Sequence, residues 1–210
     1  MKDFVYVTKK EHTPLKNKLI ELINLVQDEV REYFTFSFKF IGSADRNMIT
    51  CDYTMNVGFD FDVNIYVNDD DEEFTAEEIK KILKSGFDKH VKKFSYDYAE
   101  DSKRVLTIKV KDIENSRIIH SCDFAVVYDT SDGRQQYIHF NKTQNTYEWQ
   151  YQPDGFYELP KRIEFLKSNG HWQEVRDDYL NRKNTNTVAS KKSRSLFAET
   201  INALYNYYSN

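Results

Sequence analysis

Two aspartates inside an apolar strand place the strongest constraint on how this chain can fold. The run FDFDVNIYV, residues 59 to 67, alternates Asp60 and Asp62 with apolar side chains. Successive residues of a β-strand point to opposite faces of a sheet, so both carboxylates share one face and Phe61 and Val63 share the other. An unpaired charge in a protein core costs several kcal/mol or is lost by protonation. The carboxylate face therefore borders solvent or holds something positive.

The composition is that of a folded protein without the overall basic charge typical of nucleic-acid-binding proteins, which leaves a local basic cleft possible. Of 210 residues, 40% are hydrophobic and 30% are charged, and the formal net charge is −4. This is enough apolar material for a core, and it gives no global basic field. Cys51 and Cys122 form no Cys-x-x-Cys pair and the histidines form no zinc motif. No signal segment and no membrane-spanning apolar run occurs, so we expect a cytoplasmic protein with no membrane partner.

Hydrophobic periodicity predicts helices on both sides of a group of strands. Residues 13–34 carry an apolar stripe at helical spacing, with Thr13 as the expected N-cap, and a capping box formed by Thr75 and Glu78 begins a second helix. Strands are expected at 35–41, 59–67, 104–113 and 117–129, with a weaker pair on either side of residues 141–145, and helices follow residue 153. This order predicts an α+β fold with a mixed sheet, flanking helices and a C-terminal helical part. We expect residues 1–152 to form the catalytic core and residues 153–210 a helical region that packs on it.

A third carboxylate extends the pattern of the first two. Asp123 lies in the apolar strand SCDFAVV, on the same face as Ser121 and Ala125. If this strand neighbours the 59–67 strand, three aspartates meet on one face of the sheet. Repulsion between such carboxylates becomes binding when a divalent cation is present, and all-oxygen ligation favours Mg²⁺ or Mn²⁺.

A Gly-Ser pair supplies a complementary feature. Gly42 and Ser43 end the 35–41 strand. Glycine lets the backbone approach a ligand closely, and adjacent N–H groups with a hydroxyl suit phosphate oxygens. Carboxylate-held metal beside such a turn is the apparatus of phosphoryl or nucleotidyl transfer.

The ordered set of a strand ending in Gly-Ser, an Asp-x-Asp strand and a later lone Asp resembles the nucleotidyltransferase superfamily typified by DNA polymerase β. It is most similar to the template-independent branch that contains oligoadenylate synthases and bacterial cyclic-oligonucleotide synthases. The resemblance covers roughly residues 15–130. It implies that Gly42 and Ser43 lie at the nucleotide phosphates, that Asp60 and Asp62 bind Mg²⁺, and that Asp123 is the third ligand and aids deprotonation of the attacking hydroxyl. The sixteen residues between Ser43 and Asp60 depart from the family pattern.

The basic segment SKKSRS, residues 190–195, opens the last predicted helix. The family uses a C-terminal Lys and Ser to hold the triphosphate, so Lys191 and Lys192 are nucleotide-binding candidates. A solvated helix start is the alternative interpretation of this segment.

These features predict an enzyme that uses an NTP. It would transfer NMP to a hydroxyl acceptor (a nucleotide, an RNA end, a small molecule or a protein) and release pyrophosphate. One alternative is a catalytically idle nucleotide- or RNA-binding module of the same fold. Another is a Ca²⁺-binding protein that uses the acidic run 68–73, although no EF-hand loop pattern is present.

Overall fold

The computed structural model describes residues 2–69, 71–153 and 155–209, so Asp70 of the acidic run lies outside the described residues. The chain forms two compact units, each described here by itself. The helical unit comprises Met1–Val5, Asp52–Thr54 and Pro153–Asn210, and the sheet unit comprises Tyr6–Cys51 and Met55–Gln152. The roles predicted for residues 1–152 and 153–210 stay predictions.

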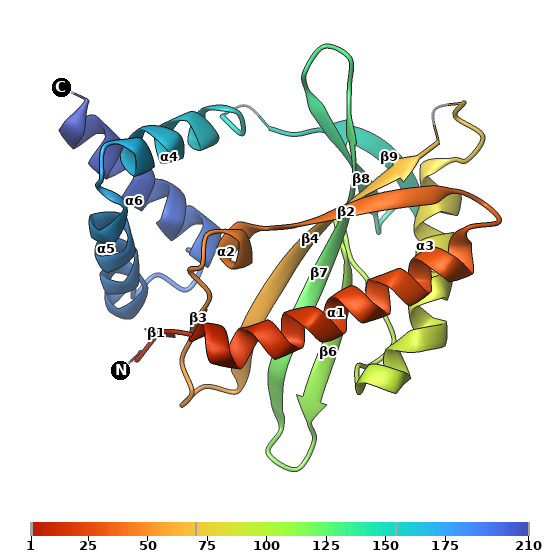
Figure 1. Ribbon diagram of the computed structural model, residues 1–210, viewed down its shortest axis with the longest axis horizontal. Coiled ribbons are helices and arrows are strands. Elements are labelled where there is room, and N and C mark those ends of the chain that lie inside the picture. The colour runs from red at the N-terminus through yellow and green to blue at the C-terminus, as the bar shows by residue number, and fades with distance from the viewer. Residues whose placement is uncertain (1, 70, 154, 210) are drawn as a thin grey trace. The chain divides into compact units, whose positions relative to one another are not determined.

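A seven-stranded mixed sheet forms the centre of the sheet unit (Figure 1). Its strands are β2 (Thr35–Ile41), β4 (Val57–Asn68), β5 (Glu100–Asp101), β6 (Leu106–Asp112), β7 (Arg117–Asp129), β8 (Gln135–Asn141) and β9 (Thr146–Tyr151). The order is β2-β4-β7-β6-β5, while β8 pairs with the end of β7 and β9 pairs with β8. Strands β4 and β7 are parallel and the other paired strands are antiparallel.

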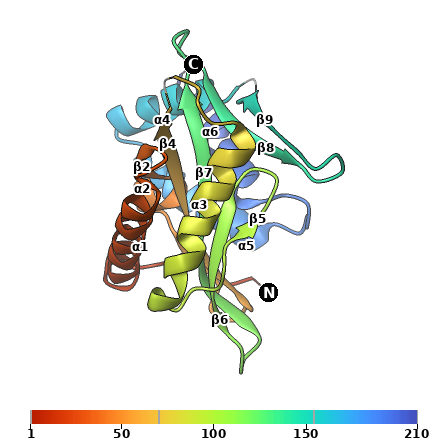
Figure 2. The same cartoon turned by 90° about the vertical axis from the view of Figure 1, so that its right-hand side faces the viewer.

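Two helices, α1 (Lys9–Val30) and α3 (Ala76–His90), lie side by side against one face of this sheet (Figure 2). Their apolar stripes and the apolar strand residues form one buried cluster, as the alternation in the strands requires. The cluster includes Leu19, Leu22, Ile23, Val26, Phe61, Val63, Ile65, Ile79, Leu83, Phe87, Ile108 and Phe124. The shorter elements are β1 (Val5–Tyr6), α2 (Gly42–Asp45), β3 (Thr50–Cys51) and the 3-10 helix η1 (Val91–Phe94).

Side-chain caps fix where the two long helices begin. The predicted N-cap Thr13 is wrong, because α1 begins earlier, at Lys9. Thr8 and Glu11 form a capping box that satisfies the first free backbone N–H groups of α1. The predicted capping box of Thr75 and Glu78 at the start of α3 is confirmed.

The helical unit contains α4 (Glu158–Ser168), α5 (Trp172–Thr185) and α6 (Ser193–Tyr208). Helix α6 packs against both of the others. Its buried Leu196, Phe197 and Ile201 occupy one helical face, and the ring of Phe197 meets Tyr179 of α5 edge-on. The predicted α+β class, with a mixed sheet and a C-terminal helical part, is confirmed. None of the described helices combines the length and apolar character that crossing a membrane requires.

Candidate functional site

The parallel pairing of β4 with β7 brings the predicted aspartates together. In the register of these strands Asp62 is the partner of Asp123, and Asp60 is the partner of Ser121. Partners in neighbouring strands point to the same side of a sheet, so all three carboxylates lie on one face. On the other face, Phe61 and Cys122 are fully buried. The strand adjacency that the candidate site needs is therefore present, and the catalytic roles of these residues stay predictions.

Two hydroxyl groups that sequence reasoning missed hold two of the carboxylates. Ser121 Oγ donates a hydrogen bond to Asp60 Oδ1, and Thr107 Oγ1 donates one to Asp123 Oδ1 at 2.6 Å. Ser121 shares the alternation of Asp123, which was a visible signal in the sequence. Thr107 depends on the β6–β7 register, in which it is the partner of Asp123, and the sequence does not reveal that register.

The site concentrates negative charge. Burial raises the pKa of Asp123, the hydrogen bond from Thr107 opposes that rise, and the charge of Asp60 adds to it. Burial also raises the pKa of the Cys122 thiol on the opposite face, and the charges of Asp123, Asp62 and Asp60 act in the same direction. Cys122 is therefore an unreactive core residue and not a nucleophile.

Gly42 lies directly against the second aspartate. Ile41 is the β2 partner of Asp62, so the residue after it follows the strand to the edge of the site. Gly42 has φ +67°, and a Cβ added to it would lie 2.4 Å from Asp62 Oδ2. Both the left-handed backbone and the contact therefore require glycine.

The long connection between Ser43 and Asp60 has a structural explanation. It contains the short helix α2 and strand β3, and β4 begins at Val57, three residues before Asp60. Because β4 pairs antiparallel with β2, Asp62 comes to lie opposite Ile41, the residue before Gly42. The extra length thus forms ordered structure and leaves Gly42 beside Asp62.

The other predicted nucleotide-binding residues have separate locations. Ser43 is half-buried in α2, next to Gly42 in the chain. Lys191 and Lys192 belong to the helical unit, where both are exposed and Lys191 pairs with Glu199 at 2.8 Å. The assignment of these residues to the nucleotide stays a prediction.

The donor set suits a hard divalent cation. Three carboxylates on one sheet face offer the all-oxygen ligands that Mg²⁺ and Mn²⁺ prefer, and the Gly42 backbone leaves the room beside Asp62 that a side chain would fill. Among residues 2–69, 71–153 and 155–209, no three or more His, Cys, Asp or Glu side chains are grouped so that they could hold a metal ion. The three aspartates thus match the ion in the chemistry of their donor atoms and share one sheet face, and their binding of a metal stays a prediction.

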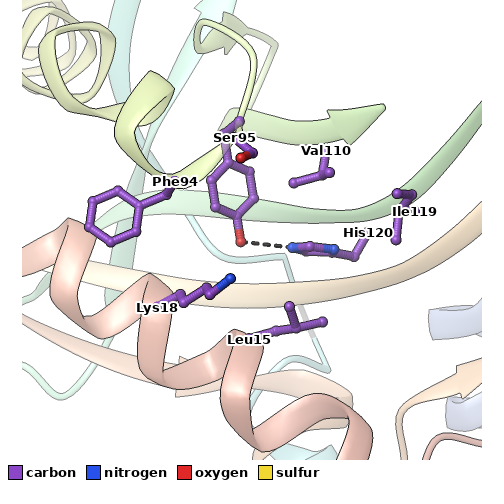
Figure 3. A pocket seen from close by; sticks show the side chains of 8 residues that line it. Leu15, Lys18, Phe94, Ser95, Val110, Ile119 and His120 are labelled. Atoms are coloured by element: carbon purple, nitrogen blue, oxygen red, sulfur yellow. Dashed lines mark hydrogen bonds between the residues drawn. The ribbon is translucent and has the colours of Figure 1, made fainter. Parts of the chain in front are cut away.

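The helix-covered face carries a histidine with a different character. His120 is buried, stacks on Phe59 and shares a hydrogen bond of 2.8 Å with Tyr96 Oη. It borders a cavity of about 230 Å³ between α1, η1, β6 and β7, with Leu15 and Lys18 on the α1 side (Figure 3). Burial lowers the pKa of His120 to about 4, so it is a neutral core residue at pH 7. It lies on the sheet face opposite Asp123.

Solved structures of nucleotide-handling proteins share this fold. Vibrio cholerae DncV in its GTP-bound form aligns with a TM-score of 0.59 and 16% identity, over 95% of this chain and 52% of that one. DncV is described as a cyclic AMP-GMP synthase in its complex with the linear intermediate pppA(3′,5′)pG, which aligns with a TM-score of 0.59 and 14% identity over 95% of this chain and 54% of that one. The CD-NTase CdnG of Bradyrhizobium diazoefficiens, in complex with GTP, aligns with a TM-score of 0.53 and 10% identity over 85% of this chain and 48% of that one.

The resemblance in fold predicted from the Gly-Ser and aspartate motifs is confirmed by these neighbours. The chain spans about half the length of the solved structures that it matches. No protein-family model and no curated protein sequence matches it.

Proposed function

We propose that this chain is a Mg²⁺- or Mn²⁺-dependent nucleotidyltransferase that transfers NMP from an NTP to a hydroxyl acceptor and releases pyrophosphate. The observation that carries the proposal is the pairing of Asp62 with Asp123 on parallel neighbouring strands, with Asp60 on the same face and Gly42 against Asp62. The same chain has the fold of DncV and CdnG, structures of which hold GTP.

Each side chain has a distinct part in the proposal. Asp60 and Asp62 bind the divalent cation, and Asp123 completes the ligand set. A cation held there would neutralise charge that develops on the phosphates and would lower the pKa of the attacking hydroxyl. Gly42 admits the phosphate chain close to the backbone, and Ser43 donates its hydroxyl to a phosphate oxygen.

The transfer is a single displacement at phosphorus. The acceptor oxygen forms a bond to the α-phosphorus as the bond to the leaving pyrophosphate breaks, and the hydroxyl proton passes to Asp123. In the metal-free protein, burial and the nearby charge of Asp60 raise the pKa of Asp123, and the hydrogen bond from Thr107 opposes that rise. The acceptor classes are a nucleotide, an RNA end, a small molecule and a protein, and direct assay distinguishes among them.

The test is incubation of the protein with each α-labelled NTP and Mg²⁺ or Mn²⁺, beginning with GTP and ATP, followed by separation of products and assay of pyrophosphate. Each acceptor class is supplied in turn. We expect a labelled product and stoichiometric pyrophosphate, both lost in the double variant Asp60→Asn with Asp62→Asn. Asp71→Asn is the matched control, because it removes an acidic side chain from an exposed loop of the same unit.

Two results would contradict the proposal. Turnover by the double variant at the rate of the parent would remove Asp60 and Asp62 from the chemistry. NTP binding by the parent without turnover, with all four acceptor classes present, would favour the idle nucleotide-binding module instead.

A further inference from the structure

Two hydroxyl groups are built into the sheet beside the site carboxylates. Thr107 is the β6 partner of Asp123, and Ser121 of β7 is the partner of Asp60 in β4. Both hydroxyls donate to their partner carboxylates, with 2.6 Å between Thr107 Oγ1 and Asp123 Oδ1. The strand register therefore fixes each hydroxyl at the carboxylate it contacts.

In both pairs the hydroxyl takes one carboxylate oxygen and leaves the other. The oxygen that accepts is Oδ1 of Asp60 and Oδ1 of Asp123. Within the described parts of the chain, neither carboxylate forms an ion pair or accepts a second side-chain hydrogen bond. The oxygen Oδ2 of each aspartate is therefore available to a ligand on that face.

We propose that Thr107 and Ser121 are positioning residues for the metal site: each fixes one oxygen of its aspartate so that the other is presented to the divalent cation. This inference rests on the proposed function and names the groups that prepare its metal ligands. It assigns no contact between either hydroxyl and the metal or the nucleotide.

The physical reason is preorganisation. Asp60 is exposed, so without a partner its side chain would populate several rotamers and would have to be ordered when the cation binds. Ser121 is buried, and Thr107 is β-branched with a restricted χ1 angle. Outer partners that orient metal ligands typically change metal affinity about 10- to 100-fold.

The test is a titration of the full chain with Mn²⁺ alone, in which electron paramagnetic resonance measures the free ion. Thr107→Val removes the hydroxyl and keeps the shape, and Ser121→Ala removes the other hydroxyl. We expect each substitution to raise the Kd for Mn²⁺ about 10- to 100-fold. Thr107→Ser keeps a hydroxyl and should stay within about threefold of the parent. Thr35→Val, the same change on edge strand β2, is the matched control.

The outcomes separate this inference from the proposed function. If Asp60→Asn with Asp62→Asn binds Mn²⁺ as tightly as the parent, the proposed metal site is wrong and the positioning roles are wrong with it. If that double variant loses Mn²⁺ while Thr107→Val and Ser121→Ala bind like the parent, only the positioning roles are overturned. Circular dichroism identifies any variant that does not fold. If Thr107→Val is such a variant, the Kd values for Mn²⁺ of Ser121→Ala and Thr107→Ser decide whether the positioning roles hold.

Discussion

The two faces of the central sheet use the same strands for different purposes. On the face covered by α1 and α3, strands β4 and β7 contribute Phe61, Val63 and Phe124 to the core. On the other face the residues between them are Asp62 and Asp123. One step along a strand therefore leads from a core residue to a residue of the proposed metal site. Substitutions at adjacent positions should therefore affect either turnover or the free energy of unfolding.

The largest expected effect is on the carboxylate face. Asp62→Asn keeps the size of the side chain and removes the charge that the proposed metal site needs. We expect turnover of NTP to fall by at least about 10³-fold, which corresponds to about 4 kcal/mol of transition-state stabilisation. The free energy of unfolding should change by less than about 1 kcal/mol, because the side chain is not part of the core. Steady-state kinetics and urea unfolding measure the two quantities. A variant as active as the parent would contradict the different roles of the faces.

The neighbouring residue should show the opposite result. Phe61 is fully buried, and its ring meets those of Phe40 and Phe59 edge-on. We expect Phe61→Ala to lower the free energy of unfolding by about 3–5 kcal/mol, because it removes buried area and leaves a cavity. Urea unfolding measures the loss, and Phe61→Leu should cost much less. Equal stabilities of Phe61→Ala and Asp62→Asn would mean that the two faces are not distinct.

The helix-covered face should also give the protein a dependence on acid. The pKa of His120 is lowered to about 4 from 6.5, mainly by burial and also by the charge of Lys18. As the pH falls, His120 takes up a proton in the unfolded chain before it does so in the folded protein. The contribution of neutral His120 to the free energy of unfolding is therefore complete above pH 6.5 and is lost as the pH falls toward 4. The loss amounts to about 3 kcal/mol. His120→Gln keeps a hydrogen-bonding group near Tyr96. In this variant the decrease in the free energy of unfolding between pH 7 and pH 4 should be smaller by that amount. An unchanged pH dependence would exclude His120 as its source.

The smallest effect is expected at the edge of the carboxylate face. Gly42→Ala places a methyl group against Asp62 Oδ2 and adds a side chain at φ +67°. The backbone term costs about 1–2 kcal/mol of stability, and displacement of Asp62 should lower turnover as well. Gly133→Ala is the control, because Gly133 has φ +79° with nothing within 4 Å of an added Cβ. It should lose similar stability and keep its turnover, and a similar loss of turnover in both variants would contradict the role of the contact.

Local patterns predicted the faces of this sheet well. Alternation placed Asp60 and Asp62 on one side of a strand and Asp123 on the same side as Ser121, since both statements need only a period of two residues. The capping box of Thr75 and Glu78 could be predicted for the same reason, because its two residues are only three positions apart. The α1 start was missed because Thr13 followed by Pro14 resembles a helix start as closely as Thr8 followed by Glu11 does.

The alignment of neighbouring strands could not be predicted from the sequence. The parallel alignment of β4 with β7 joins Asp62 to Asp123 across about sixty residues, and no turn between them sets that alignment. The hydroxyl of Thr107 enters the site only through a further strand, and Gly42 reaches Asp62 only through the β2–β4 pairing. Long-range packing decides these contacts.

The distant origin of the paired strands has a consequence for how the protein forms. Chain segments that are far apart lose more entropy on meeting than neighbouring segments do, and such contacts slow folding. Helix α1 and strand β2 are adjacent in sequence, whereas β4 and β7 are separated by α3 and β6. In refolding from denaturant we therefore expect helical circular dichroism to return before turnover does. An interrupted refolding assay, in which turnover is measured after increasing refolding times, would show when the site forms. We expect that time to be set by the alignment of β4 with β7.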